Sequence, residues 1–162
     1  MEARFGRYEG VISTRVGYTE GDEPAPTYHD IDGHTEAVRV EYDPAVLSYQ
    51  DLLDRFFESR NPHLPAWKRQ YMSAVFAVDA EQERAARQKV RAVEEKEGGP
   101  VRTKVLAAGP FRAAEDYHQK FYLQQHREAL ADLAQRHKTF WEFEPPVPLA
   151  SLSGVFVPRI IC

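Results

Sequence analysis

Glu36-Ala37-Val38-Arg39-Val40-Glu41-Tyr42-Asp43-Pro44 is the stretch that decides the fold. Apolar and polar residues alternate along it, which is typical of a strand buried on one face. Val38, Val40 and Tyr42 share that buried face. Because proline cannot donate a hydrogen bond to a neighbouring strand, Asp43-Pro44 marks the end of the strand.

Working outward, the same reasoning predicts further strands and helices on both sides of this stretch. Ser48, with Asp51 at the capping-box position, predicts the start of a helix. Asp79 predicts the start of a second helix, which Gly98-Gly99-Pro100 ends. Helical structure, in one piece or two, is expected from Phe111 to about His137. Strands are expected at Val11–Tyr18, Met72–Val78 and Val101–Ala107. Strands and helices intermix without regular βαβ spacing, which favours an α+β fold.

Composition narrows the class of protein. With 162 residues, 43% of them hydrophobic, the chain is long enough for one packed domain. The formal net charge of −4 is spread along the chain without a basic stripe, so we expect no nucleic-acid partner. We also expect no membrane segment, because no apolar run approaches about 18 residues. The single cysteine, Cys162, and the absence of an apolar leader favour a cytoplasmic protein without a disulfide framework.

Two polar clusters carry the candidate chemistry. Ala114–Lys120 gathers two carboxylates, a phenol, an imidazole and an amide. Gly33–Val38 contains Glu36, which shares the parity of the buried strand face. A carboxyl group desolvated there favours its neutral form and could act as an acid; the alternative is a solvated residue at a frayed strand end. His118 could equally be a half-buried histidine with one satisfied hydrogen bond.

A metal site is not expected. His34 and Glu36 are two residues apart on the expected strand and would point the same way. No third ligand stands at a convincing spacing.

Six motifs stand in order along the chain: Arg15-Val16-Gly17-Tyr18, Pro26-Thr27-Tyr28, Gly33-His34-Thr35-Glu36-Ala37-Val38, Tyr42-Asp43-Pro44, Arg69-Gln70-Tyr71-Met72-Ser73 and Ala114-Glu115-Asp116-Tyr117-His118-Gln119. Together they resemble the methionine sulfoxide reductase A family, over Met1 to about residue 127. The resemblance implies a ferredoxin-like two-layer α+β sandwich with long loops over residues 1–145, followed by an irregular tail over residues 146–162.

The resemblance also implies a reaction and a set of roles. The family reduces the S-sulfoxide of oxidised methionine in proteins, with a cysteine as nucleophile. Glu36 is then the expected proton donor, and Tyr28 and Tyr71 the phenols that bind the sulfoxide oxygen. His118 and Asp116 would support the site. The implied electron donor is thioredoxin or another dithiol, with no bound cofactor, and the protein would act as a monomer.

The sequence departs from the family at several places. The family's Gly-Cys-Phe-Trp motif would stand just before Met1, and no cysteine occurs before Cys162. Ala66 stands where many members carry aspartate, and Phe121 where tyrosine is usual. We expect first a start-site truncation that removes the nucleophile and the first central strand, which would leave the chain inactive as it stands.

Several alternatives to a truncation stay open. The chain could be a nucleophile-free module that binds oxidised methionine. Residues 154–162 could instead fill the vacated strand slot and bring Cys162 to the site, although Pro158 argues against a central strand there. Cys162 could be a resolving thiol or a stray terminal one. A non-catalytic α+β interaction domain is the rival from another class.

Overall fold

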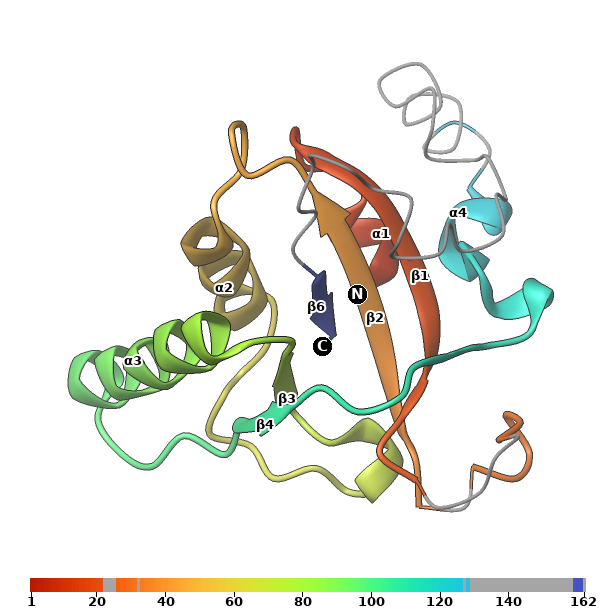
Figure 1. Cartoon of the computed structure of the whole chain (residues 1–162). Helices are drawn as coiled ribbons and strands as arrows, with labels where there is room; N and C mark the ends of the chain where they lie inside the picture. Colours follow the sequence, from red (N-terminus) through yellow and green to blue (C-terminus); the bar gives the residue numbers. More distant parts are fainter. Residues whose placement is uncertain (22–25, 32, 127, 129–158, 162) are drawn as a thin grey trace.

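The computed structural model describes residues 1–21, 26–31, 33–126, 128 and 159–161. Within these residues one mixed sheet has the strand order β4-β3-β6-β2-β1-β5 (Figure 1). The strands are β1 (Val11–Thr19), β2 (Thr35–Tyr42), β3 (Ala74–Ala77), β4 (Lys104–Ala107), β5 (Arg112–Ala113) and β6 (Arg159–Ile161). Only β3 and β4 pair in parallel; the other pairs are antiparallel.

Helices cover one face of this sheet. They are α1 (Glu2–Phe5), α2 (Tyr49–Glu58), α3 (Ala80–Glu97) and α4 (Phe121–Gln125), with 3-10 turns η1 (Arg69–Tyr71) and η2 (Asp116–His118). Figure 1 shows α2 and α3 together beside β3, and α1 against β1 and β2. None of the helices in the described ranges is both long and apolar enough to cross a membrane.

The main core lies between the sheet and these helices. Phe5 of α1 and Val40 of β2 are essentially inaccessible to solvent, as are Leu52, Leu53 and Phe56 of α2. Burying side chains of this size contributes about 1.5–3 kcal/mol each. The predicted face of β2 is therefore confirmed, because Val38, Val40 and Tyr42 belong to this cluster.

Both predicted helix starts are confirmed. The Ser48 hydroxyl accepts the backbone N–H of Asp51 at 3.1 Å, and the Asp51 carboxylate accepts the Ser48 N–H at 3.0 Å. At α3, the Asp79 carboxylate accepts the N–H groups of Glu81 and Gln82 at 2.9 and 2.8 Å. Such caps satisfy donors that the first helical turn leaves unpaired.

The helix expected from Phe111 does not begin there, although Phe121–Gln125 within the expected range is helical; residues 127 and 129–137 lie outside the described residues. Arg112–Ala113 pairs with Gly17 and Tyr18 as β5, and a 3-10 turn and the short α4 follow. Because β4 and β5 lie at opposite edges of the sheet, the chain must cross the sheet between them (Figure 1). Gly17 permits the crossing, since a Cβ atom there would lie 2.2 Å from the Arg112 carbonyl oxygen and 2.4 Å from the Phe111 ring.

The expected tail contains a strand. Arg159–Ile161 forms β6 between β2 and β3, with Ile161 opposite both Arg39 and Phe76. The C-terminal segment thus fills the slot between these strands, whereas the sequence favoured leaving that slot vacant. Pro158 does not prevent the pairing, because β6 begins one residue later. Residues 146–158 and Cys162 lie outside the described residues.

Candidate active site

A cavity of about 670 Å³ opens where α1, β2, η1 and η2 meet. Glu36, Ala37 and Val38 of β2 form one wall, and residues 1–4 and 7 form another. The remaining described lining residues are Val16, Arg60, Gln70, Tyr71, Met72, His118, Lys120, Phe121 and Tyr122. Segments that are far apart in the sequence therefore meet at a single hollow.

Glu36 presents its carboxyl group on the helix-covered face. It is the second residue of β2 and is half-buried, so the frayed and fully solvated alternative is excluded. Gln70 donates a hydrogen bond of 2.6 Å from its side-chain amide to Glu36 Oε1. Tyr18 lies directly opposite Glu36 in the β1–β2 register and so points to the same side of the sheet.

Two phenols meet beside Glu36. Tyr71, at the end of η1, shares a side-chain hydrogen bond with Tyr28 from the loop after β1. Desolvation raises the pKa of Tyr71, and the nearby charge of Glu36 and the bond to Tyr28 raise it further. Tyr71 therefore keeps its proton and remains a hydrogen-bond donor at neutral pH. Tyr28 is not among the described residues that line the cavity, and reaches the site through Tyr71.

An exposed tryptophan covers Tyr71 from outside. The rings of Trp67 and Tyr71 stack with centroids 5.2 Å apart at 26°. Trp67 is 74% exposed, so the face of its ring that does not stack on Tyr71 is accessible to solvent. Leu64 in the same loop is also exposed.

Glu115 fixes the loop that carries Tyr28. Its Oε1 atom accepts the backbone N–H of Tyr28 at 3.1 Å, and its Oε2 atom accepts the Tyr18 hydroxyl at 2.8 Å. Desolvation alone would raise the pKa of this carboxyl group. The hydrogen bonds from its own backbone, from Tyr28 and from Tyr18 outweigh that effect and lower the pKa. A carboxylate stabilised in this way positions its neighbours and is a poor proton donor.

His118 lies close to Tyr28, whereas Asp116 lies apart from the cavity. The His118 ring packs against the rings of Tyr28 and Tyr117, with centroid distances of 4.5 and 4.2 Å. Its Nε2 atom is buried without a hydrogen-bond partner among the described residues. Asp116 is exposed and does not line the cavity within the described part of the chain. Cys162 lies outside the described residues.

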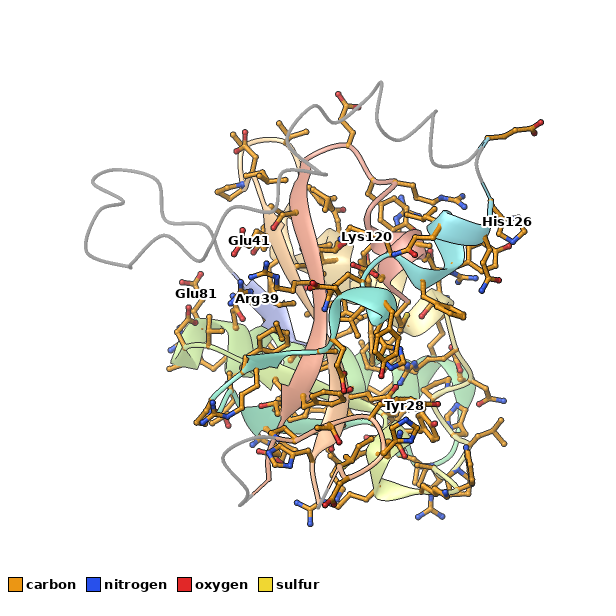
Figure 2. The ribbon with its side chains drawn as sticks, turned by 90° about the vertical axis from the view of Figure 1, so that its right-hand side faces the viewer. Tyr28, Arg39, Glu41, Glu81, Lys120 and His126 are labelled. Carbon is orange, nitrogen blue, oxygen red and sulfur yellow. The ribbon has the colours of Figure 1, made fainter. Side chains whose placement is uncertain are left out.

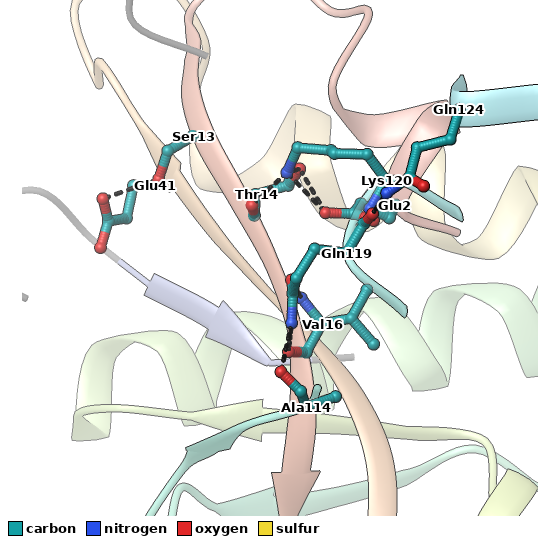
Figure 3. A network of polar contacts seen from close by, with 9 residues as sticks. All are labelled: Glu2, Ser13, Thr14, Val16, Glu41, Ala114, Gln119, Lys120 and Gln124. Atoms are coloured by element: carbon teal, nitrogen blue, oxygen red, sulfur yellow. Dashed lines mark hydrogen bonds and ion pairs between the residues drawn. The ribbon is translucent and has the colours of Figure 1, made fainter. Parts of the chain in front are cut away.

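A buried ion pair holds the wall formed by α1. Lys120 Nζ contacts Glu2 Oε1 at 2.5 Å and Thr14 Oγ1 at 2.8 Å (Figure 3). The Lys120 backbone N–H donates to Glu2 Oε2 at 2.6 Å, which holds Lys120 at a positive φ of 55° that costs energy outside glycine. Desolvation lowers the pKa of Lys120, and the Glu2 carboxylate partly offsets this effect.

Gln119 joins the same segment to the sheet. Its side-chain amide donates to the carbonyl oxygens of Val16 and Ala114, at 2.9 Å each, and accepts the Val16 N–H at 3.0 Å (Figure 3). The side chain thus continues the pairing of β1 where β5 ends. Figure 2 shows Tyr28 and Lys120 on this β1 side of the molecule.

The structure brings some of the expected site residues together and places others elsewhere. It brings Glu36, Tyr28 and Tyr71 together, whereas His34 lies before β2 with its Nδ1 atom 2.7 Å from the Ile31 carbonyl oxygen. No group of three or more metal-ligating side chains occurs among the described residues. Sequence reasoning assigned no role to Gln70, Glu115 and Tyr18. All three lie within the quoted motifs, which was the available signal.

Comparison with known proteins agrees with the motifs. A family model described as peptide methionine sulfoxide reductase matches residues 1–144. A peptide methionine sulfoxide reductase MsrA from Azorhizobium caulinodans is 42% identical over 134 residues, which cover 74% of this chain and 61% of that protein. The protein of the same name from Sulfolobus acidocaldarius is 37% identical, over 75% of this chain and 74% of its own length.

A solved structure shares the fold. Methionine sulfoxide reductase A of Corynebacterium diphtheriae aligns with a TM-score of 0.71 and 30% sequence identity, over 78% of this chain and 69% of that chain. The predicted α+β class is confirmed by this similarity. The chain therefore spans about three fifths of the Azorhizobium protein and more of the other two.

Proposed function

The chain belongs to the peptide methionine sulfoxide reductase family, and from that premise we propose that its cavity binds the S-sulfoxide of methionine for reduction to the thioether. The observation that carries the proposal is the convergence of Glu36, Tyr71 and Tyr28. Two phenols that share a hydrogen bond stand beside a half-buried carboxyl group. A sulfoxide oxygen is a strong acceptor of the size of a water molecule, and this arrangement offers it several donors.

The chemistry assigned to these residues is proton delivery and charge stabilisation. The attacking thiolate would be that of the family's Gly-Cys-Phe-Trp motif, which this sequence does not contain. It attacks the sulfoxide sulfur, and Glu36 protonates the oxygen as the sulfur–oxygen bond breaks. The released hydroxide then attacks the sulfur of the former thiol and breaks its bond to the methionine sulfur. The thioether leaves, and the attacking residue is left as a sulfenic acid. A second thiol then forms a disulfide and releases that oxygen as water. Tyr71 and Tyr28 would stabilise the charge that develops on the oxygen.

Other residues would hold the acid and the phenols in place. Gln70 fixes the rotamer of Glu36 through the 2.6 Å hydrogen bond. The Glu115 carboxylate fixes Tyr28 by accepting the backbone N–H of Tyr28, and His118 packs against the Tyr28 ring. Asp116 keeps only the predicted supporting role that the family resemblance implies.

The thiol that resolves the sulfenic acid is the next part of the proposal. Cys162 is the one cysteine in the sequence. It follows Ile161, which lies opposite Arg39, and β6 runs antiparallel to β2. Because the two strands are antiparallel, β6 runs toward the start of β2, where Glu36 lies. The thiol of Cys162 is therefore a candidate for resolving the sulfenic acid. Substitution of Cys162 by serine tests this role.

Partners and setting follow from the family and extend the proposal. The substrates would be oxidised proteins, and thioredoxin or another dithiol would supply the electrons. We further infer a monomer that acts in the cytoplasm. A pull-down with a thioredoxin whose resolving cysteine is replaced would trap a mixed disulfide if thioredoxin is the donor.

Binding tests the function without depending on turnover. Short peptides that contain the S-sulfoxide, the R-sulfoxide or unoxidised methionine are titrated into the protein by calorimetry. We expect the S-sulfoxide to bind most tightly, because only that epimer places its oxygen at Glu36 and Tyr71 while the methyl group enters the cavity. Equal affinity for the three peptides would contradict the proposal.

A further inference from the structure

The lining of the cavity carries an excess of positive charge that differs from the rest of the protein. Among the described residues that form it, four are basic and two are acidic. The whole chain has a formal net charge of −4. The excess is therefore local. The charged lining residues are Glu2, Arg4, Arg7, Glu36, Arg60 and Lys120.

Part of this charge is neutralised inside the protein. Glu2 and Lys120 form a buried pair, with side chains 8% and 10% exposed, and they cancel one another. Glu36 is the one acidic side chain left among the described lining residues, and Gln70 occupies one of its oxygens. The exposed guanidinium groups of Arg4 and Arg7 are therefore the charges that a ligand meets first at this lining.

The three arginines stand at different depths. Arg4 lies in α1 and Arg7 two residues after its end, and both are exposed, so their guanidinium groups can adjust to a bound peptide. Arg60 is half-buried, and its Cζ atom lies 4.8 Å above the Phe56 ring, which limits its movement. Guanidinium groups pair with carboxylates through two parallel hydrogen bonds. The edge of the cavity that Arg4 and Arg7 form is thus suited to a carboxylate on a peptide residue next to the one bound in the cavity.

We propose that this cavity selects methionine sulfoxide residues flanked by aspartate or glutamate, so that the preferred substrates are acidic segments of oxidised proteins. The inference rests on the proposed function, since it places the sulfoxide at Glu36. The flanking carboxylates then lie near Arg4 and Arg7. Basic flanks meet like charges instead, which disfavours binding and slows encounter.

The expected preference is moderate and depends on salt. Solvent-exposed charge pairs are weak singly, so two of them favour acidic over basic flanks by about five- to tenfold in affinity. The preference should shrink strongly at about 0.5 M salt, where charges are screened over a few ångströms.

The test uses the full chain and four labelled peptides, followed by fluorescence anisotropy. The peptides have glutamate or lysine on both sides of a central residue, which is either methionine S-sulfoxide or methionine. We expect the glutamate-flanked sulfoxide to bind most tightly. The double substitution Arg4→Gln with Arg7→Gln should abolish the difference between flanks and leave the difference between sulfoxide and thioether.

The control is Arg84→Gln with Arg91→Gln, which removes the same charge from exposed positions on α3. It should leave both differences intact. Equal affinity for the two flanks, or an equal effect of the control pair, overturns the inference alone. Loss of the sulfoxide preference with a persisting preference for acidic flanks overturns the proposed function instead. If no sulfoxide peptide binds, both are overturned.

Discussion

The side-chain amide of Gln70 donates a hydrogen bond of 2.6 Å to the carboxyl group of Glu36. The two residues come from different elements, η1 and β2, and this bond aims the carboxyl group at the cavity that Tyr71 also lines. The acid proposed for the reaction is therefore held by a neutral partner. The bond therefore fixes the position of the carboxyl group without placing a second charge beside it.

Substitution Glu36→Gln tests the proton donor. The assay uses a form of the protein that carries the family's Gly-Cys-Phe-Trp motif ahead of Met1, with dithiothreitol as reductant. The rate should fall on the order of 10²-fold, because an amide keeps the shape but cannot deliver a proton. Circular dichroism should show an unchanged fold. Near-full activity across neutral pH would move the acid elsewhere, with His118 as the next candidate.

Substitution Gln70→Leu tests the positioning of Glu36. Loss of one hydrogen bond leaves the carboxyl group in several rotamers, so kcat should fall by about tenfold, less than in Glu36→Gln. Substrate affinity should change little. Combining the two substitutions should cost no more than Glu36→Gln alone. If the losses multiply instead, Gln70 acts independently of Glu36.

The fold could be predicted from the sequence where local pattern and tertiary structure agree. The alternation around Val38 and Val40 indicated the correct buried face, and Ser48 the correct start of α2. The segment after Phe111 could not be predicted, because its pairing with Gly17 and Tyr18 depends on a distant strand. The sequence leaves the strand β6 as the least favoured of the alternatives, because Pro158 counts against a central strand; its pairing depends on the distant strands β2 and β3.

In the candidate site too, the sequence could place residues that share one strand but not contacts between distant segments. Glu36 could be placed by its parity with Val38, because both lie on one strand. The contacts of Glu115 with Tyr18 and Tyr28 join segments that are far apart in sequence. No spacing rule predicts such contacts, and only the family motifs indicated that these residues meet.

The Glu2–Lys120 pair should be important for stability. Lys120→Met leaves the Glu2 carboxylate buried without its ion-pair partner, and the free energy of unfolding should fall by about 3 kcal/mol. Urea denaturation measures it. Adding Glu2→Gln removes the unpaired charge, so the double variant should regain part of the loss. A double variant as unstable as the sum of the two single ones would show that the residues act separately.

The stability of the fold should depend on pH through the carboxyl group of Glu115. The pKa of Glu115 is lowered in the folded protein. Its carboxylate therefore stabilises the fold at pH values above its pKa in the unfolded chain, and this contribution is lost as the pH falls through its pKa in the folded protein. Between about pH 6 and about pH 3, the Glu115→Gln variant should lose less unfolding free energy than the parent. Parallel pH profiles would contradict the role given to this carboxylate.

The strand β6 should stabilise the sheet. Its backbone pairs with both β2 and β3, and buried backbone groups without partners are costly. Deleting residues 159–162 should lower the midpoint of thermal unfolding by several degrees, whereas Cys162→Ser should not. An unchanged midpoint after the deletion would show that the pairing contributes little to the fold.

The most direct test is a crystal structure of the protein bound to a short peptide that contains methionine S-sulfoxide. The account predicts that the sulfoxide oxygen lies about 2.6–3.2 Å from the Glu36 carboxyl group and from the Tyr71 hydroxyl. The Tyr28 hydroxyl should stay hydrogen-bonded to Tyr71 or turn to the same oxygen. A sulfoxide bound elsewhere, or bound in the cavity with its oxygen turned away from Glu36 and Tyr71, would contradict the account.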